Sequence, residues 1–318
     1  MTVAPPGLLV DIGHRRLHLF SMGEGSPPVV LEAGIAASSL SWSHVQPRVA
    51  TFARTYSYDR AGLAWSDPCV RPVTAASCAD DLHRLLSAAG VKGPCVLVGH
   101  SYGAFVLHVY ASRHPERVAG LVLVDPIYPD EWLNLPRRER WRLKGGAFLS
   151  RVGALLARTG LVRACLTRLS RGSTGVPRRI SRMFGSEAAK VLSRLVGEVQ
   201  KLPVETWPAV QAHWSEPKCF TSMAEHLAGL RKSAAEVAAC GDLPRHIPVA
   251  ILSAATQSEA YRQEHARMAA RSEHGRHVLA SGSGHWILLD EPDLVVDAIR
   301  HVATLATNSS ESSTVQTA

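Results

Sequence analysis

The sequence predicts an α/β fold in which a mainly parallel β-sheet is covered by helices on both faces. Short continuous runs of apolar and β-branched residues alternate with segments of helical periodicity. This alternation is typical of a parallel sheet buried between crossover helices. The chain has 318 residues, 46% of them hydrophobic, which is enough for one large domain or for a core with an inserted piece.

The first half of the chain follows this alternation from its start. A hairpin is expected around Gly13, because apolar runs flank this residue on both sides. Short buried strands are expected next, and Gly90 is expected to end the helix over 75–90. The predicted elements are strands over 8–10, 17–20, 29–34, 55–58, 95–98 and 118–124, with helices over 42–53, 75–90 and 104–112.

The alternation breaks in the middle of the chain. Between residues 127 and 245 no convincing strand pattern occurs, and arginine- and alanine-rich stretches with helical spacing predict an inserted helical cap. Strands are expected again at 247–253 and 276–280, followed by a helix over 293–305. The expected organisation is a core over 1–126 and 246–306, a cap over 127–245 and a disordered polar tail over 307–318.

Composition limits the classes of protein to consider. No run of about 18 apolar residues occurs, and the N-terminus lacks the pattern of a signal peptide, so we expect neither a membrane span nor export. The six cysteines have no CxxC or paired spacing. We interpret them as free thiols of a reducing, cytoplasmic compartment without a zinc site, with a Cys69–Cys78 disulfide as the alternative.

The formal net charge of +8 is unevenly distributed. Residues 137–182 contain twelve arginines and one lysine against one acid, Glu139. We interpret this segment as a solvated helical face whose arginines cover apolar surface. Because no nucleic-acid-binding motif accompanies the charge, we expect no nucleic-acid partner. An anionic substrate and a weak contact of the basic cap with an anionic membrane surface are the alternatives.

The stretch 96–104, VLVGHSYGA, is typical of a nucleophile held on a tight turn. It passes from a buried strand directly into a helix and fits the pattern G-x-S-x-G, with Ser101 framed by Gly99 and Gly103. The glycines provide steric relief to a strained backbone. The alternative is a glycine-rich turn with an ordinary serine.

A serine hydroxyl is a poor nucleophile at neutral pH and needs a base with a pKa near 7, which histidine provides. Among 15 histidines, His285 is the best candidate, because it lies in a loop of small residues, SGSGHW, after the last predicted strand. His100 is expected to point elsewhere as part of the turn, and Trp286 is close enough to line a substrate pocket.

Five segments together resemble the α/β-hydrolase superfamily over roughly residues 8–125 and 245–305. They are VVLEAG (29–34), YDRAGLAWSDP (58–68), VLVGHSYGA (96–104), RHPERVAGLVLVDP (113–126) and SGSGHWILLDEPDLVVDAI (281–299). The resemblance implies a sheet of about eight strands, a serine nucleophile after the fifth and a histidine after the eighth. Epoxide hydrolases and haloalkane dehalogenases of this superfamily need a carboxylate where Ser101 stands, so the serine points to acyl transfer.

The resemblance also implies an oxyanion hole made of two backbone amides. One is the N–H of Tyr102, after the nucleophile, and the other is the N–H of Ile35, which follows Gly34 at the edge of the substrate site. Relatives often carry His-Gly in this loop, where this chain has Ala33 and Gly34. Backbone amides do not require that histidine. The alternative is that Ile35 is an ordinary loop residue.

The acid of the catalytic triad is less well defined. Most members of the superfamily place an aspartate after the seventh strand, where this chain reads ILSAATQSE (251–259) and offers only Glu259, several residues late. Asp125 ends the sixth strand, and some branches use an acid there. We therefore assign Asp125, with Glu259 and a purely structural Asp125 as alternatives. Arg60, after the strand at 55–58, is interpreted as structural.

The expected function is hydrolysis of a carboxylic ester or lactone through an acyl-enzyme on Ser101, with His285 as general base and Asp125 as its partner. No cofactor and no metal are implied, and the apolar cap helices suggest a small hydrophobic substrate. Two alternatives stay open. One is a serine-dependent carbon–carbon bond hydrolase or acyltransferase, and the other is a non-catalytic, hydrolase-like ligand receptor.

Overall fold

An eight-stranded sheet of order β1-β2-β4-β3-β5-β6-β7-β8 organises the chain in a computed structural model that describes residues 3–69, 72–170 and 200–315. β1 and β2 are antiparallel to each other and β2 to β4, whereas the other neighbours pair in parallel. The predicted fold class is confirmed. The strands are β1 (Leu8–Asp11), β2 (Arg16–Met22), β3 (Val29–Glu32), β4 (Thr55–Tyr58), β5 (Cys95–His100), β6 (Val118–Val124), β7 (Val249–Ala254) and β8 (Gly275–Ala280).

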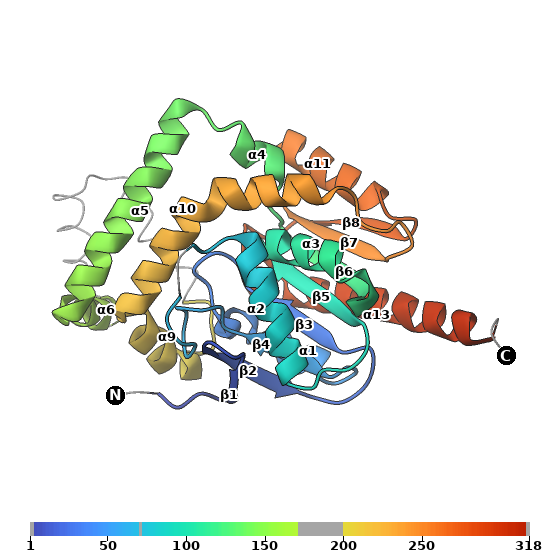
Figure 1. Cartoon of the computed structure of the whole chain (residues 1–318), viewed down its shortest axis with the longest axis horizontal. Coiled ribbons are helices and arrows are strands. Elements are labelled where there is room, and N and C mark those ends of the chain that lie inside the picture. The colour runs from blue at the N-terminus through green and yellow to red at the C-terminus, as the bar shows by residue number, and fades with distance from the viewer. Residues whose placement is uncertain (1–2, 70–71, 171–199, 316–318) are drawn as a thin grey trace.

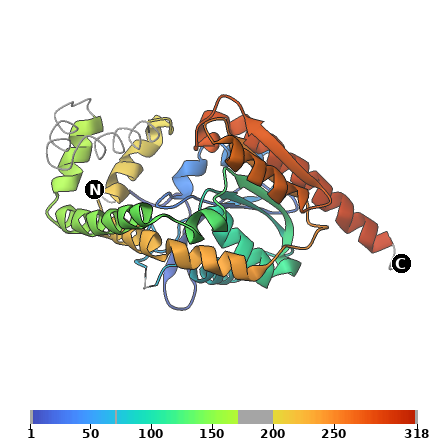
Figure 2. The ribbon, with the colours of Figure 1, turned by 90° about the horizontal axis from the view of Figure 1, so that it is seen from above.

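Two hydrophobic layers cover the two faces of the sheet (Figures 1 and 2). One layer is formed by helices α2 (Ala75–Ala88), α3 (Gly103–Arg113) and α11 (Glu259–Ala270). The other is formed by α1 (Gln46–Val49), α12 (Ile287–Asp290) and α13 (Pro292–Val315). Central strand β5 is buried along its entire length, which explains its continuous apolar sequence.

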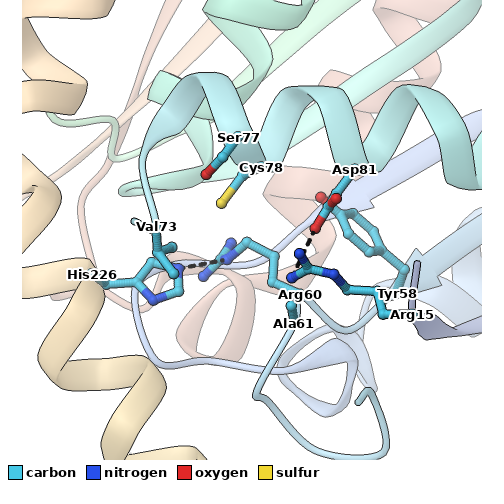
Figure 3. Close-up of a pocket in the computed structure, with 9 residues that line it drawn as sticks. All are labelled: Arg15, Tyr58, Arg60, Ala61, Val73, Ser77, Cys78, Asp81 and His226. Atoms are coloured by element: carbon cyan, nitrogen blue, oxygen red, sulfur yellow. Dashed lines mark hydrogen bonds and ion pairs between the residues drawn. The ribbon is translucent and has the colours of Figure 1, made fainter. Parts of the chain in front are cut away.

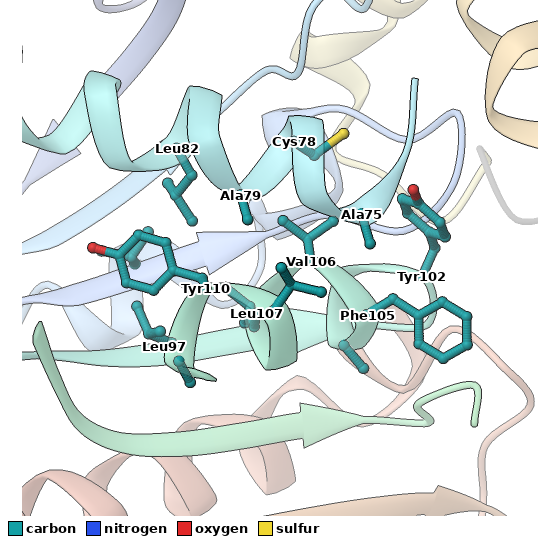
Figure 4. Packing of buried hydrophobic residues seen from close by; sticks show 14 of the residues in the cluster. Ala75, Cys78, Ala79, Leu82, Leu97, Tyr102, Phe105, Val106, Leu107 and Tyr110 are labelled. Carbon is teal, nitrogen blue, oxygen red and sulfur yellow. The ribbon is translucent and has the colours of Figure 1, made fainter. Parts of the chain in front are cut away.

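Helix α2 illustrates how the sequence builds these layers. Thr74 caps its N-terminus, and the Thr74 and Ser77 side chains form a reciprocal capping box with each other's backbone amides. Leu82, Leu85 and Leu86 have helical spacing and are fully buried. Figure 4 shows Leu82 of α2 above Tyr110 of α3, with Leu97 of β5 below them, in one hydrophobic cluster. Helices α2 and α3 therefore hold the central strands in a fixed position.

Between β6 and β7, the described residues form helices and no strand. α10 runs along α5 and continues over α2 and α3, where its second half contributes Leu230, Ala234 and Val237 to the core (Figure 1). The predicted cap thus shares its last helix with the core. Residues 171–182 of the predicted basic segment lie outside the described residues. The elements are α4 (Pro129–Leu133), α5 (Arg137–Arg158), α6 (Leu161–Ser170), η3 (Val204–Thr206), α9 (Trp207–Trp214) and α10 (Pro217–Cys240).

Two expectations differ from the structure. The helix predicted over 42–53 is replaced by the short elements η1 (Ser39–Trp42) and α1, because Pro47 has no N–H to continue a helix from Ser43 and its ring clashes with that carbonyl. The tail predicted to be disordered over 307–318 is helical as far as Val315. A formed helix propagates easily, since each added residue gains a hydrogen bond.

Two further features bear on the sequence analysis. All six cysteines are free thiols, so the alternative Cys69–Cys78 disulfide is absent. Within residues 3–69, 72–170 and 200–315, no helix combines the length and the apolar character that a membrane span requires.

Candidate active site

Ser101 stands on a strained turn between β5 and α3. Its φ angle of 53° lies in the left-handed region that serine rarely adopts. Its N–H donates to Val124 O at 3.0 Å and its carbonyl accepts from the Ala104 amide at 3.1 Å, so the turn is pinned on both sides. Strain of this kind persists only where the surroundings enforce it, and it is common at functional sites.

The two glycines of the turn allow close packing. A Cβ atom on Gly99 would lie 2.8 Å from Leu107 Cδ1, and one on Gly103 would lie 2.8 Å from the Glu32 carbonyl oxygen. Real Cβ atoms do not approach other atoms so closely. Because α3 packs directly on β3 and β5, a side chain at Gly103 would meet backbone, and one at Gly99 would have to displace the Leu107 side chain.

Asp125 and His285 form the closest polar contact of the site. His285 Nδ1 lies 2.6 Å from Asp125 Oδ2, and the Asp125 side chain is fully buried. The other carboxylate oxygen accepts the Ala254 amide at 3.1 Å, and Gln257 Nε2 donates to Oδ2 at 2.7 Å. Burial favours the neutral carboxyl, but the hydrogen bond and charge interaction with His285, together with the other two donors, lower the pKa of Asp125.

Glu259, the alternative acid, lies elsewhere. It is the first residue of α11, its side chain is 68% exposed, and it binds Arg262 and Gln263. Gln257 is the residue of this segment that reaches the site, as an amide donor to Asp125. Gln257 was not predicted as a site residue, although it follows β7, where most members of the superfamily carry the acid.

His285 is held in a loop whose backbone is tied to nearby carboxylates. Gly284 N donates to Asp290 Oδ2 at 3.2 Å, and Gly282 N donates to Glu291 Oε1 at 2.9 Å. No hydrogen bond joins Ser101 Oγ to His285 among the described residues. In free enzymes this contact is often long and tightens only when substrate binds.

His100 has a supporting position that the sequence did not predict. Its Nε2 donates to the His285 carbonyl at 2.9 Å, so its ring braces the backbone of the candidate base. The ring also packs against Trp286, with centroids 5.0 Å apart. Burial, together with the nearby His285, lowers the pKa of His100 to about 3, so it stays neutral.

The two predicted oxyanion donors belong to the segments that adjoin Ser101, the start of α3 and the loop after β3. Tyr102 caps the N-terminus of α3, where the first amides of a helix have no intrahelical acceptor. Ile35 follows Gly34 on the loop after β3. A Cβ on Gly34 would lie 3.5 Å from Ser101 Cβ and 2.8 Å from His100 Nδ1, so the loop runs directly against the nucleophile turn.

Comparison with known proteins identifies the family. The model of the alpha/beta hydrolase family matches residues 29–298, and the chain belongs to this family. An AB hydrolase superfamily protein of Gibberella zeae is 38% identical over 103 residues, which cover 31% of this chain and 32% of that protein. A haloalkane dehalogenase of Sphingobium indicum is 30% identical over 136 residues, 41% of this chain and 46% of its own length.

Solved structures agree with this fold at low identity. An esterase from Thermogutta terrifontis is 20% identical, with a TM-score of 0.62, over 92% of this chain and 94% of its own. An enol-lactonase from Burkholderia xenovorans is 15% identical, with a TM-score of 0.57, and the match covers 92% of this chain and 98% of the enol-lactonase. The chain spans only 20% to 43% of the length of the first curated relatives it matches.

Proposed function

We propose that this protein is a serine hydrolase that cleaves a carboxylic ester or lactone through an acyl-enzyme on Ser101. The observation that carries the proposal is the 2.6 Å contact of His285 Nδ1 with the buried, ionised Asp125, next to a serine on a strained turn. A hydrolase with this constellation needs neither a metal nor a cofactor for acyl transfer.

The geometry supports a two-step mechanism. A carboxylate oxygen only accepts hydrogen bonds, so the proton of neutral His285 resides on Nδ1 and its Nε2 is free to accept the Ser101 proton. Ser101 Oγ then attacks the carbonyl carbon, and the amides of Ile35 and Tyr102 stabilise the oxyanion. His285 protonates the leaving alcohol. Water, deprotonated by His285, attacks the acyl-enzyme and releases the acid.

The nucleophile type favours esters over the substrates of some relatives. One relative is described as a haloalkane dehalogenase, and solved neighbours include an epoxide hydrolase. Attack of a serine on an alkyl carbon would leave an ether, which water does not cleave under these conditions. Attack on an acyl carbon leaves an ester, which a histidine-activated water hydrolyses. The esterase and enol-lactonase neighbours fit this chemistry.

Turnover of aryl esters and lactones by wild type, Ser101→Ala and Asp125→Asn tests the proposal. We expect Ser101→Ala to abolish turnover and Asp125→Asn to reduce kcat on the order of 10³-fold or more, because the amide stabilises the wrong histidine tautomer. A second run with an added alcohol acceptor separates hydrolysis from acyl transfer. Undiminished turnover in Ser101→Ala would refute the assignment.

We also propose that the outer face of α5 makes a weak contact with an anionic membrane surface. Trp141, Phe148 and Leu155 are spaced seven residues apart and are 72%, 63% and 60% exposed. The helix carries six arginines and one lysine against one glutamate. Its opposite side, with Ala147, Ala154 and Ala157, is buried towards α10. Exposed apolar residues flanked by cations suit the surface of an anionic bilayer.

A further inference from the structure

Arg60 is a fully buried cation with an unusual set of partners. It follows β4, and its residue is only 4% exposed. Its guanidinium donates to the Glu32 carboxylate, which also accepts the Tyr58 hydroxyl. A buried charge needs such a partner, so Glu32 and Tyr58 hold Arg60 in place. The remaining donors of Arg60 point to backbone and to the cap.

Two of these donors bind the loop that carries Ile35. Nη1 donates to the Ala33 carbonyl at 2.6 Å, and Nη2 donates to the Gly34 carbonyl. The Gly34 carbonyl and the Ile35 N–H belong to one planar peptide group. A hydrogen bond that fixes the carbonyl therefore fixes the direction of the Ile35 N–H. It also polarises the amide and strengthens it as a donor.

Arg60 also touches the residue that carries the second oxyanion amide. Its Cζ atom lies 5.5 Å from the centroid of the Tyr102 ring, in cation–π geometry. The Arg60 guanidinium thus binds the peptide group that contains the Ile35 N–H. It also contacts the side chain of Tyr102, whose N–H is the other assigned donor. Lysine lacks the planar fork that makes these contacts together.

A cap residue completes the arrangement. Arg60 Nε donates to His226 Nε2 of α10 at 3.3 Å, as Figure 3 shows, and His226 Nδ1 donates to the Ser222 carbonyl at 2.8 Å. His226 is therefore neutral, with its proton on Nδ1. Burial, together with the positive Arg60, lowers the pKa of His226 to about 3, so this acceptor persists over any working pH.

We infer that Arg60 is a positioning residue for the oxyanion hole and that His226 links its orientation to the seating of cap helix α10. This inference rests on the proposed function and adds to it two residues outside the triad. The cap then acts on catalysis through the direction of the Ile35 amide as well as through the shape of the substrate site.

The cavity beside Arg60 offers a matched control. It has a volume of about 40 Å³, and Arg60 and Arg15 both line it (Figure 3). Arg15 pairs with Asp81 at 3.5 Å and donates to neither Ala33 nor Gly34. Arg15→Lys therefore makes the same chemical change at the same cavity without touching the oxyanion loop.

The first experiment compares Arg60→Lys with Arg15→Lys by kinetics. Loss of one oxyanion donor costs about 10²–10³ in kcat, so a misdirected donor in Arg60→Lys should lower kcat by at least about tenfold. KM should change less than kcat, because the hole acts on the transition state. Arg15→Lys should match wild type. Equal kinetics of Arg60→Lys and wild type, or an effect on KM alone, would overturn the positioning role.

A second readout does not depend on activity. In protein labelled with ¹⁵N-isoleucine, the Ile35 amide signal should shift in Arg60→Lys and stay in place in Arg15→Lys. An unmoved Ile35 signal would refute the inference even if the proposed function holds. A shifted signal in a protein without esterase activity would support the Arg60 contact and refute the proposed function.

The link to the cap is tested with His226→Leu and His226→Gln. Leucine removes the acceptor of Arg60 Nε, and we expect a smaller fall in kcat than for Arg60→Lys, with partial rescue in the glutamine variant. In the Arg60→Lys background, the His226→Leu effect should largely vanish, because both act through one contact. Fully additive effects, or a normal kcat and Ile35 signal in His226→Leu, would contradict the link. These variants keep the test informative if Arg60→Lys does not fold.

Discussion

Asp125 has the surroundings that its proposed orienting role requires. Its φ angle of 43° places it on a strained backbone directly after β6, and its side chain accepts from His285, Ala254 and Gln257. The resulting low pKa keeps it ionised. In the proposed mechanism, the carboxylate then holds the histidine proton and stabilises the imidazolium.

Gln257→Leu should lower stability at neutral pH by about 1.5–3 kcal/mol, the usual range for a hydrogen bond to a charged group. A carboxyl with a lowered folded-state pKa stabilises the fold above its ordinary pKa of about 3.9, and this contribution is lost as pH falls through the folded value. The deficit of the variant should therefore shrink below about pH 4. Urea unfolding at several pH values measures both effects.

Gln263→Leu is the control for this change. Gln263 makes the corresponding amide contact with the exposed Glu259 at 3.1 Å. Its loss should have little effect on stability, since exposed charges are well solvated. Equal losses in the two variants would show that the Gln257–Asp125 contact has no special weight.

At the scale of elements, a chain of hydrogen bonds joins β8, β7 and α11 beneath the site. His265 Nε2 donates to the Pro126 carbonyl at 2.8 Å, so its Nδ1 must accept from the Ser253 hydroxyl at 2.6 Å. Ser253 Oγ in turn accepts from His277 Nε2 at 2.7 Å. This order requires neutral His265, because a protonated Nδ1 could no longer accept from Ser253.

Ser253→Ala should cost about 1–3 kcal/mol, because it leaves buried His265 Nδ1 without its donor. Burial lowers the pKa of His265 and of His277. For a histidine with a lowered pKa, the stability contribution is present above about pH 6.5 and is lost as pH falls towards the folded value. The melting temperature of the wild-type protein should therefore fall as the pH is lowered below about 6.5. A flat profile from pH 7 to 5 would contradict this order of donors.

The close packing of α3 at Gly103 can be compared with the open surroundings of Gly145 on α5. Gly103→Ala should destabilise the protein and reduce activity, because its Cβ would meet the backbone oxygen of Glu32. On α5, a Cβ at Gly145 would have no other atom within 4 Å. Gly145→Ala should therefore stabilise the protein by about 0.5–1 kcal/mol, because alanine favours the helix more than glycine does. Denaturation midpoints measure both, and equal shifts would contradict the packing argument.

At the scale of the whole molecule, charge and apolar surface coincide on α5. Seven cations on one helix oppose self-association through that helix and favour an anionic partner. We expect the protein to sediment with phosphatidylglycerol vesicles at low salt, and to be released at about 1 M salt, where the screening length is about 3 Å.

Variants make this prediction specific. A Trp141→Ser/Phe148→Ser double variant should lose vesicle binding, whereas Leu8→Ser, at a residue 73% exposed on β1, should keep it. Equal binding to vesicles of pure, neutral phosphatidylcholine would contradict an electrostatic contact. Binding to anionic vesicles that salt does not weaken would contradict it too. A concentration-dependent dimer abolished by the double variant would instead identify a second copy as the partner.

The sequence predicted the sheet well where the signal is local. Strands 55–58 and 118–124 and the turn at Ser101 have patterns that neighbouring residues determine. The roles of His100 and Arg60 depend on contacts between segments far apart in the chain. Such contacts leave no periodicity in a single sequence, so only the structure could show them.

Covalent capture of Ser101 is the decisive test of its role as nucleophile. Wild-type protein is treated with a fluorophosphonate probe, digested, and searched for the modified peptide by mass spectrometry. We expect one adduct per chain, on Ser101, formed much more slowly in Asp125→Asn. Absence of labelling, or an adduct on another residue in a folded wild-type protein, would contradict this role and favour a hydrolase-like ligand receptor.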